Sequence, residues 1–298
     1  MSTDLKREDV FANGVELASV MGLDREHGKR VLTYPNSKKV KVYTFINPVL
    51  MTDTFRVSKL PPTLRDTLFS LFQHHERTVE YDNVRVDWNA SHVNVWCPSI
   101  DTVLFAKALR KVLKEPFRSG VELGCGSGFL SKYALSKFSS LRSMLVNDLN
   151  PYAIKCAMDN IKDKRAVFFA GDGLKKIQGM KFDLMLCNPP YVPRPHSIND
   201  NPYEGIGLLN HLVHEGQKYL HPNGKLIVNI SSLCWDLVLK EKPLMKMKVL
   251  ERMNVPLKVN NILNNNAWLE YLQHHGLKKK LHQGYEYWQE LFIVSLEF

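Results

Sequence analysis

Short apolar segments alternate with segments of helical spacing from about Arg118 to the end of the chain. Apolar runs predict five strands, at residues 120–125, 143–148, 166–172, 182–188 and 224–231. Helical spacing predicts intervening helices at residues 129–138, 151–161 and 208–220. Two later apolar segments, at residues 247–259 and 287–298, would complete a sheet of seven strands. The alternation predicts an α/β fold with a doubly wound, mostly parallel sheet.

The chain before this region has a different pattern. Residues 79–97 alternate like a β-hairpin, and a helix is expected at 98–114. The first 78 residues predict a small α+β module, with strands near residues 40–57 and a helix near 64–75. We therefore expect an N-terminal module at residues 1–78, a candidate for substrate recognition, and a catalytic domain at residues 79–298. An asparagine-rich segment at residues 264–275 predicts a helix within an insert.

Composition and charge narrow the class of protein. Forty Lys and Arg against thirty Asp and Glu give a net charge of +10, which favours an acidic partner such as nucleic acid, RNA more than DNA. The five cysteines lack metal-binding spacing, so no metal is expected, and they fit free thiols in a reducing compartment. No apolar run approaches the length of a membrane span, and the charged N-terminus lacks a signal-peptide core. We expect a cytoplasmic protein without a membrane partner.

A glycine loop joins the first predicted strand to its helix. "VELGCGSG" contains Gly124, Gly126 and Gly128, which let a ligand approach the backbone and the free N–H groups of a helix start. The dinucleotide fingerprint requires glycine where this chain has Phe129, and no Gly-Lys-Ser/Thr follows for a phosphate-binding loop. The loop therefore matches neither phosphate-binding pattern, and by itself it does not specify the ligand.

Three acidic residues end successive predicted strands. Asp148 lies 20 residues beyond Gly128, a suitable offset for binding ribose hydroxyls. Asp172 could face an adenine amino group, and Glu122 could receive an ammonium. Alternatively, Asp148 could cap the next helix, and Asp172 could only form a turn. Together the three acids suit a ligand with an adenosine end and an amino-acid end.

The fourth strand runs into a stiff polar turn, "NPPY", comprising Asn188, Pro189, Pro190 and Tyr191. The Asn188 side-chain oxygen and the Pro189 carbonyl, held still by the fixed φ of proline, could accept both N–H bonds of a planar nitrogen. Tyr191 offers a flat face for stacking. These four residues are the expected catalytic set, and orientation of the attacking nitrogen is their expected contribution.

The order of "VELGCGSG", "NDLNPYA", "AGDG" and "NPPY" resembles class I S-adenosylmethionine-dependent methyltransferases with an Asn-Pro-Pro-Tyr motif, over about residues 98–231. The resemblance implies that the glycine loop binds the methionine end of S-adenosyl-L-methionine, Asp148 the ribose, and Asp172 the adenine side. Asn188 is expected in both the cofactor-binding and the catalytic sets.

The substrate has several candidates at this point. Pro98, Asp101 and Thr102, with the glycines after the turn, resemble the HemK-type protein-glutamine N-methyltransferases of translation. Their substrates are glutamines of release factors or ribosomal proteins, and this is the first expectation. HemK-type enzymes usually have an all-helical N-terminal domain, whereas strands are expected here. The charge suits the alternative, an adenine-N6 or guanine-N2 methyltransferase of RNA or DNA. A third alternative is a non-catalytic cofactor-binding partner subunit.

Overall fold

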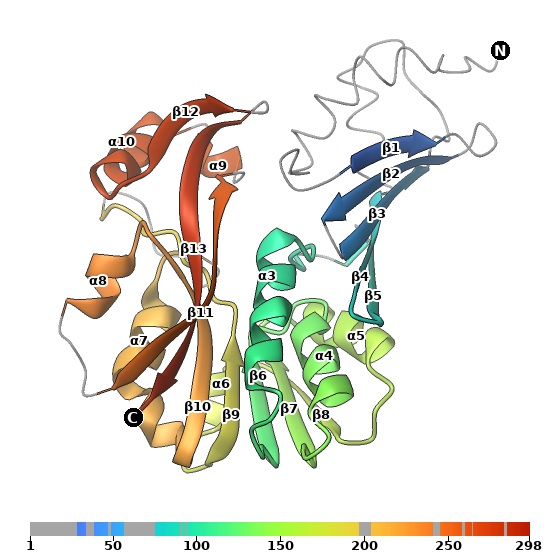
Figure 1. Ribbon diagram of the computed structural model, residues 1–298, viewed down its shortest axis with the longest axis vertical. Coiled ribbons are helices and arrows are strands. Elements are labelled where there is room, and N and C mark those ends of the chain that lie inside the picture. Colours follow the sequence, from blue (N-terminus) through green and yellow to red (C-terminus); the bar gives the residue numbers. More distant parts are fainter. Residues whose placement is uncertain are drawn as a thin grey trace.

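The computed structural model describes residues 29–33, 39–46, 49–56, 75–89, 91–92, 94–196, 204–240, 245–257, 260–263, 265–282 and 285–298. Two sheets organise this part of the chain (Figure 1). Among these residues, no helix is both long and apolar enough to cross a bilayer.

The larger sheet contains five neighbouring parallel strands in the order β10-β9-β6-β7-β8. These strands are β6 (Ser119–Leu123), β7 (Ser143–Asp148), β8 (Ala166–Ala170), β9 (Phe182–Cys187) and β10 (Leu220–Ser231). They confirm the five strands predicted from apolar runs. Strands β7 and β8 lie on one side of β6, and β9 and β10 lie on the other, so the strand order changes direction at β6. Such a position is where open α/β sheets bind ligands.

Three further strands extend the sheet beyond β10. They are β11 (Lys246–Pro256), β12 (Lys278–His282) and β13 (Tyr285–Glu297). β13 runs antiparallel to β10 and β11 runs antiparallel to β13, which confirms the two closing strands. The prediction of seven strands is one short, because β12 also pairs with β13. Its lysine-rich sequence has little of the apolar character on which the strand predictions rest.

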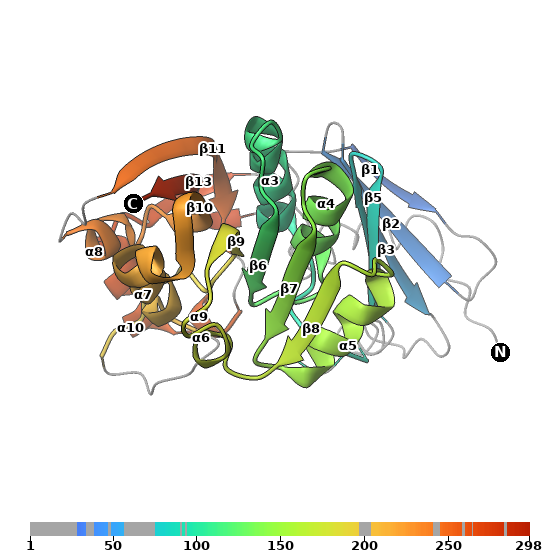
Figure 2. The ribbon, with the colours of Figure 1, turned by 90° about the horizontal axis from the view of Figure 1, so that it is seen from below.

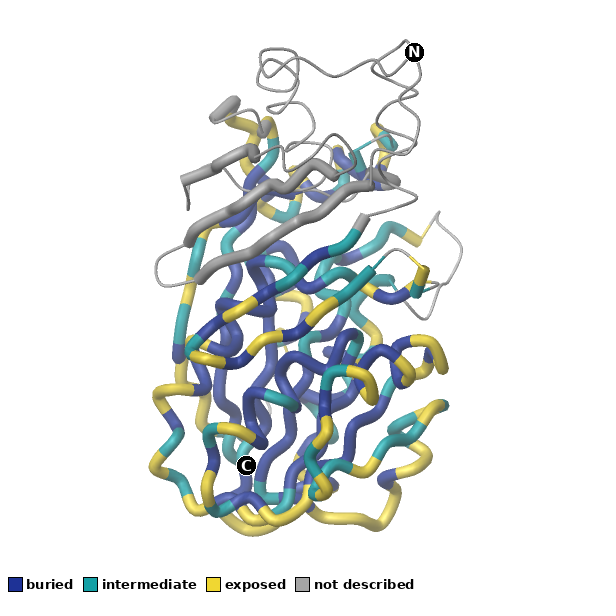
Figure 3. Tube along the Cα trace, turned by 90° about the vertical axis from the view of Figure 1, so that its right-hand side faces the viewer, coloured by how far each residue is buried: buried dark blue, intermediate teal, exposed yellow. Residues whose placement is uncertain are grey.

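Helices cover both faces of the larger sheet (Figure 2). They are α3 (Ile100–Leu109), α4 (Phe129–Lys137), α5 (Pro151–Asn160), α6 (Gly173–Lys176), α7 (Gly207–Glu215) and α8 (Trp235–Leu239), with short 3-10 turns η1 (Arg110–Val112) and η2 (Gly216–Tyr219). Leu184 and Leu186 of β9 pack in the core with α3 and α4, whereas Met185 and Cys187 pack in the core with α7. Alternate side chains of one strand therefore fill two cores, which explains its unbroken apolar run. Figure 3 shows buried positions concentrated at the centre and exposed positions along the outer loops.

The smaller sheet is an antiparallel meander of five strands in sequence order. They are β1 (Lys29–Thr33), β2 (Lys39–Ile46), β3 (Val49–Arg56), β4 (His75–Tyr81) and β5 (Val84–Asn89). The β4–β5 hairpin confirms the expected hairpin, and Asp82 and Asn83 at its turn have φ of 52° and 62°. The boundary expected after residue 78 falls inside β4. Most of the helix expected at residues 64–75, residues 64–74, lies outside the described residues.

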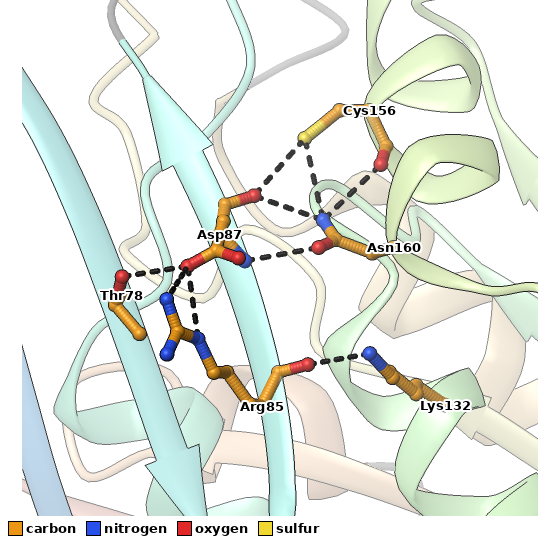
Figure 4. Close-up of polar contacts among 6 residues, drawn as sticks. All are labelled: Thr78, Arg85, Asp87, Lys132, Cys156 and Asn160. Carbon is orange, nitrogen blue, oxygen red and sulfur yellow. Dashed lines mark hydrogen bonds and ion pairs between the residues drawn. The ribbon is translucent and has the colours of Figure 1, made fainter.

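Polar contacts fasten this sheet to the helices beside the glycine loop (Figure 4). Asn160 of α5 accepts from Asp87 N at 2.9 Å and donates to Asp87 O at 2.9 Å. Its Nδ2 also lies 3.1 Å from Ser127 O in the glycine loop. Lys132 of α4 donates to Arg85 O at 2.6 Å. The edge of the smaller sheet is therefore joined directly to the helices that follow β6 and β7.

Candidate active site

The glycine loop between β6 and α4 adopts a backbone that requires glycine. Gly124, Gly126 and Gly128 have φ of 74°, 51° and 80°. At Gly128 an added Cβ would lie 2.9 Å from Ala157 Cβ, so this glycine allows the start of α4 to pack on α5. At Gly124 no atom of the described residues lies within 4 Å of an added Cβ, so the loop has open space beside it. The loop combines a fixed backbone with room for a ligand.

Asp148 at the end of β7 lies against the same loop. Its Oδ2 accepts from Gly126 N and its Oδ1 from Asn150 N, each at 2.9 Å. Burial raises the pKa of Asp148, while the backbone donors Asn150, Gly126 and Leu149 oppose that rise. The structure thus brings together the glycine loop and the acid that the sequence assigned to one ligand.

Asp172 lies two residues beyond β8 and begins α6. Its Oδ1 accepts from Lys175 N at 3.2 Å, and its Oδ2 lies 3.7 Å from Lys175 Nζ. Asp172 therefore caps α6, a local role that the sequence suggested for Asp148 and not for Asp172. The neighbouring Asn147, which sequence reasoning missed, donates to Phe169 O at 3.0 Å and Gly171 O at 2.9 Å. Asn147 thereby ties the end of β8 to β7 and holds Asp172 near Asp148.

Glu122 is 1% exposed and lies behind the glycine loop. Its Oε2 accepts from Ser131 N at 2.8 Å and from the Ser131 hydroxyl, in the first turn of α4. Burial raises the pKa of Glu122 to about 8, against the effect of the two Ser131 bonds, and Asp148 adds to the rise. The contacts described for Glu122 therefore fasten α4 to β6. Its role toward an ammonium group stays a prediction.

Asn188 follows β9 and is oriented by two residues from distant parts of the chain. Its Nδ2 donates to Asp101 Oδ2 at 3.1 Å, and its Oδ1 accepts from Asn229 Nδ2 at 2.9 Å. A carboxylate accepts hydrogen bonds, so Asp101 selects the NH₂ end of the amide and fixes where Oδ1 points. An amide oxygen accepts two hydrogen bonds, which leaves Oδ1 capacity for a second donor.

Asp101 is itself held firmly at the start of α3. Its Oδ1 accepts from Ser99 Oγ at 2.7 Å and Thr102 N at 2.9 Å, and its side chain is 5% exposed. Tyr191 OH donates to Asp101 Oδ2 at 3.4 Å, and burial together with the Asp101 charge raises the pKa of Tyr191. One carboxylate therefore positions both polar side chains of the Asn-Pro-Pro-Tyr turn.

Asn229 of β10 was not singled out from the sequence. It is fully buried, and its Oδ1 has no hydrogen-bond partner among the residues that the structure describes. Leaving such an acceptor unpaired costs about 1–3 kcal/mol. Buried groups of this kind are concentrated at functional sites. A polar residue inside the apolar run "LIVNIS" was the available signal.

The remaining turn residues and one aromatic complete the site. Pro189 is buried, Pro190 is partly buried, and the Tyr191 ring packs between both cores of the larger sheet. Trp96 is 65% exposed, and its backbone oxygen lies 3.8 Å from a Cβ added at Gly126. An exposed aromatic side chain therefore belongs to the segment that runs beside the glycine loop.

The geometry fits an adenosine ligand with an amino-acid end, because an open glycine loop, a strand-end acid and a polar turn meet at one edge of the sheet. Comparison with known proteins agrees. The family described as "Methyltransferase small domain" matches residues 91–254, more than half of the chain. Class I architecture and S-adenosyl-L-methionine as cofactor, both implied by the sequence motifs, are confirmed.

Three relatives share part of this chain. A putative protein N5-glutamine methyltransferase of Methanocaldococcus jannaschii is 30% identical over 59% of this chain and 93% of its own length. A release factor glutamine methyltransferase of Aquifex aeolicus is 29% identical over 43% of this chain and 51% of its own length. A ribosomal protein uL3 glutamine methyltransferase of Francisella tularensis is 30% identical over 38% of this chain and 41% of its own length. This chain therefore spans about half or less of the last two relatives. Because the family match spans more than half of the chain, and because the alignment with the first relative covers 93% of that relative, the chain belongs to the methyltransferase small domain family.

Proposed function

We propose that the protein methylates the side-chain amide nitrogen of a glutamine in a protein substrate. The observation that carries the proposal is the orientation of Asn188. Asp101 binds its NH₂ end, so Oδ1 is the end available to an incoming N–H donor. Tyr191, whose hydroxyl donates to the same carboxylate, is the aromatic residue of this turn on which a planar group would stack.

This arrangement suits a nitrogen whose lone pair is delocalised into a π system. S-adenosyl-L-methionine supplies the electrophilic methyl group. Asn188 Oδ1 and the Pro189 carbonyl accept the two N–H bonds of the substrate amide, which aims its lone pair at the methyl donor. The proton leaves after the nitrogen has gained positive charge, so no strong general base is required at the start.

Glutamine is favoured over other planar nitrogens by the relatives, three of which carry names that specify glutamine. We propose a substrate of the translation machinery, a release factor or a ribosomal protein. Such substrates agree with the cytoplasmic location expected from the sequence.

A nucleobase amino group is the second candidate, and the charge of the chain favours it. Lys278, Lys279 and Lys280 are exposed on β12, in a protein with a net charge of +10. Such a run can bind phosphates, although lysines also protect the edges of sheets from pairing. An adenine or guanine amino group would satisfy the same two acceptors and stack on the same tyrosine.

We also propose that the N-terminal module, expected at residues 1–78, recognises the substrate of the methyltransferase domain at 79–298. Support comes from the position of the smaller sheet, which packs against α4 and α5. Its connection runs through residues just beyond the expected boundary: Tyr81 stacks on Tyr133 with ring centroids 5.8 Å apart, and Asn160 links β5 to the loop at Ser127. A partner seated on this sheet would be close to the cofactor.

The substrate class is tested by incubating the purified protein with methyl-labelled cofactor and a cell extract. We expect label in protein that survives ribonuclease and disappears with protease. Label that is lost with ribonuclease and survives protease would show that the substrate is a nucleobase and not a glutamine. An Asn188→Ala protein in parallel identifies label that depends on the proposed site.

A further inference from the structure

A segment outside the family-matched region packs on Val192 and Pro193, directly after the Asn-Pro-Pro-Tyr turn. It consists of α9 (Asn260–Leu263), α10 (Asn266–His274) and β12, and we name it the C-terminal insert. Figure 1 shows α10 and β12 at the end of the molecule where the smaller sheet also lies. The apolar cluster that buries it contains Ile262, Trp268, Leu269, Leu272 and Leu277 of the insert, together with Leu233 and Leu257 from outside it.

One hydrogen bond joins the insert to Pro193, two residues after Tyr191. Trp268 Nε1 donates to Pro193 O at 2.9 Å, and Trp268 is 3% exposed. Val192 packs against the apolar core of the insert, so two consecutive residues after Tyr191 contact it. Asn265 caps α10 and accepts from Trp268 N at 3.1 Å, which fixes the backbone that carries the indole.

The segment from Asn188 to Pro193, which is the turn with the two residues that follow it, depends on contacts from other elements because it has few backbone donors of its own. Pro189, Pro190 and Pro193 have no N–H, so half of the six residues from Asn188 to Pro193 cannot donate backbone hydrogen bonds. A buried carbonyl also needs a donor in place of water. At its first end the turn is held by Asp101, and at its second end Trp268 is the donor.

We infer that Trp268 is a positioning residue for methyl transfer, acting through Pro193 on the placement of Tyr191 and of the substrate amide. The role of Trp268 rests on the proposed function for its kinetic consequence. Through Trp268, the C-terminal insert helps to position the catalytic turn. Cofactor binding should not depend on it, because the glycine loop and Asp148 lie on other elements of the larger sheet.

The test is Trp268→Phe, which deletes the indole N–H and keeps an aromatic ring. Trp288→Phe is the matched control, because Trp288 is also buried and donates Nε1 to Lys280 O at 3.0 Å, away from the turn. For the substrate that the wild type methylates, we expect kcat to fall about five- to tenfold in Trp268→Phe. The Kd for S-adenosylhomocysteine should stay within about twofold, and Trp288→Phe should keep both values within about twofold.

Hydrogen exchange gives a readout that needs no substrate. In Trp268→Phe we expect faster exchange in a peptide covering residues 184–196, and no such change in Trp288→Phe. Unchanged exchange there would overturn the inference, as would an unchanged kcat or an equal loss of kcat in both variants. Absence of methyl transfer to any glutamine by the wild type would instead refute the proposed function, and exchange would still decide the role of Trp268.

If Trp268→Phe does not fold, Asn265→Ala removes the cap beneath the indole and leaves the ring in place. The inference then requires faster exchange of the same peptide in Asn265→Ala. Wild-type exchange in a folded Asn265→Ala protein would overturn it.

Discussion

Replacing Asp101 by asparagine tests the orientation of the catalytic amide with almost no change in shape. Oδ2 of Asp101 accepts from Asn188 Nδ2 and Tyr191 OH, at 3.1 and 3.4 Å. In Asp101→Asn, an NH₂ group at that position would meet two donors. Each lost bond to a charged acceptor is worth about 1.5–3 kcal/mol, and partial rearrangement recovers some of it, so we expect unfolding free energy to fall by about 2–4 kcal/mol.

The larger effect is expected on catalysis. Asn188 can recover a hydrogen bond by turning its Oδ1 toward the new NH₂ group, which removes that oxygen from the substrate. Loss of one preoriented polar group at an active site typically lowers kcat by about 10²-fold, or about 2.7 kcal/mol.

The assay is steady-state transfer of labelled methyl to the identified substrate, with chemical denaturation of the same samples. Ser99→Ala is the control, because it removes a donor to Oδ1 and part of the capping box of α3 but leaves both hydrogen bonds to Oδ2 in place. Ser99→Ala should lose about 1 kcal/mol of stability and keep kcat within about twofold. A folded Asp101→Asn protein with kcat within threefold of wild type would refute the proposed role of the carboxylate.

Three further predictions concern the other site residues. Asn188→Ala should abolish methyl transfer while calorimetry finds the affinity for S-adenosylhomocysteine within about twofold of wild type; normal turnover would disprove the catalytic role. Asp148→Ala should weaken cofactor binding by about 1–3 kcal/mol. Asp159→Ala, on the exposed face of α5, should leave cofactor binding unchanged. An unchanged Kd for the cofactor in Asp148→Ala would exclude a ribose contact. Glu122, whose pKa of about 8 lies above its ordinary value of 4.5, stays neutral in the fold while the unfolded chain ionises, so its contribution to stability declines as pH rises between these values. Chemical denaturation of wild type and Glu122→Gln measures this effect. Between pH 5 and pH 8 the unfolding free energy of the variant should rise relative to that of wild type by up to about 4 kcal/mol. A constant difference between the two proteins across this range would contradict the buried neutral carboxyl.

The elements of the larger sheet could be predicted because their sequence signals are local. Strand β9 is an unbroken apolar run that ends at Asn188, and α5 begins with Pro151 and a capping Asn150 whose side chain accepts from Tyr152 N. Each signal lies within the segment that it specifies, so strand and helix boundaries agree within a few residues for most of these elements.

Contacts between distant segments could not be predicted in the same way. Asp101 stood out only as part of a motif, and its bond to Asn188 joins residues 87 positions apart. Asn229 is 41 positions from Asn188, and Trp268 is 75 positions from Pro193. Such pairs depend on the order of strands and on the packing of the insert. Asp172 shows the opposite case, since the local capping signal is visible in the structure and its ligand role remains a prediction.

The central claim is methyl transfer to a planar amide nitrogen of protein glutamine, and the chemistry of the product tests it most directly. Protein labelled by the purified enzyme and methyl-labelled cofactor is recovered, freed of nucleic acid and hydrolysed in acid, which cleaves a methylated glutamine amide. The account predicts that the label is released as methylamine and that Asn188→Ala yields none. Label recovered instead as a methylated nucleobase, or retained on an amino acid after hydrolysis, would contradict the claim.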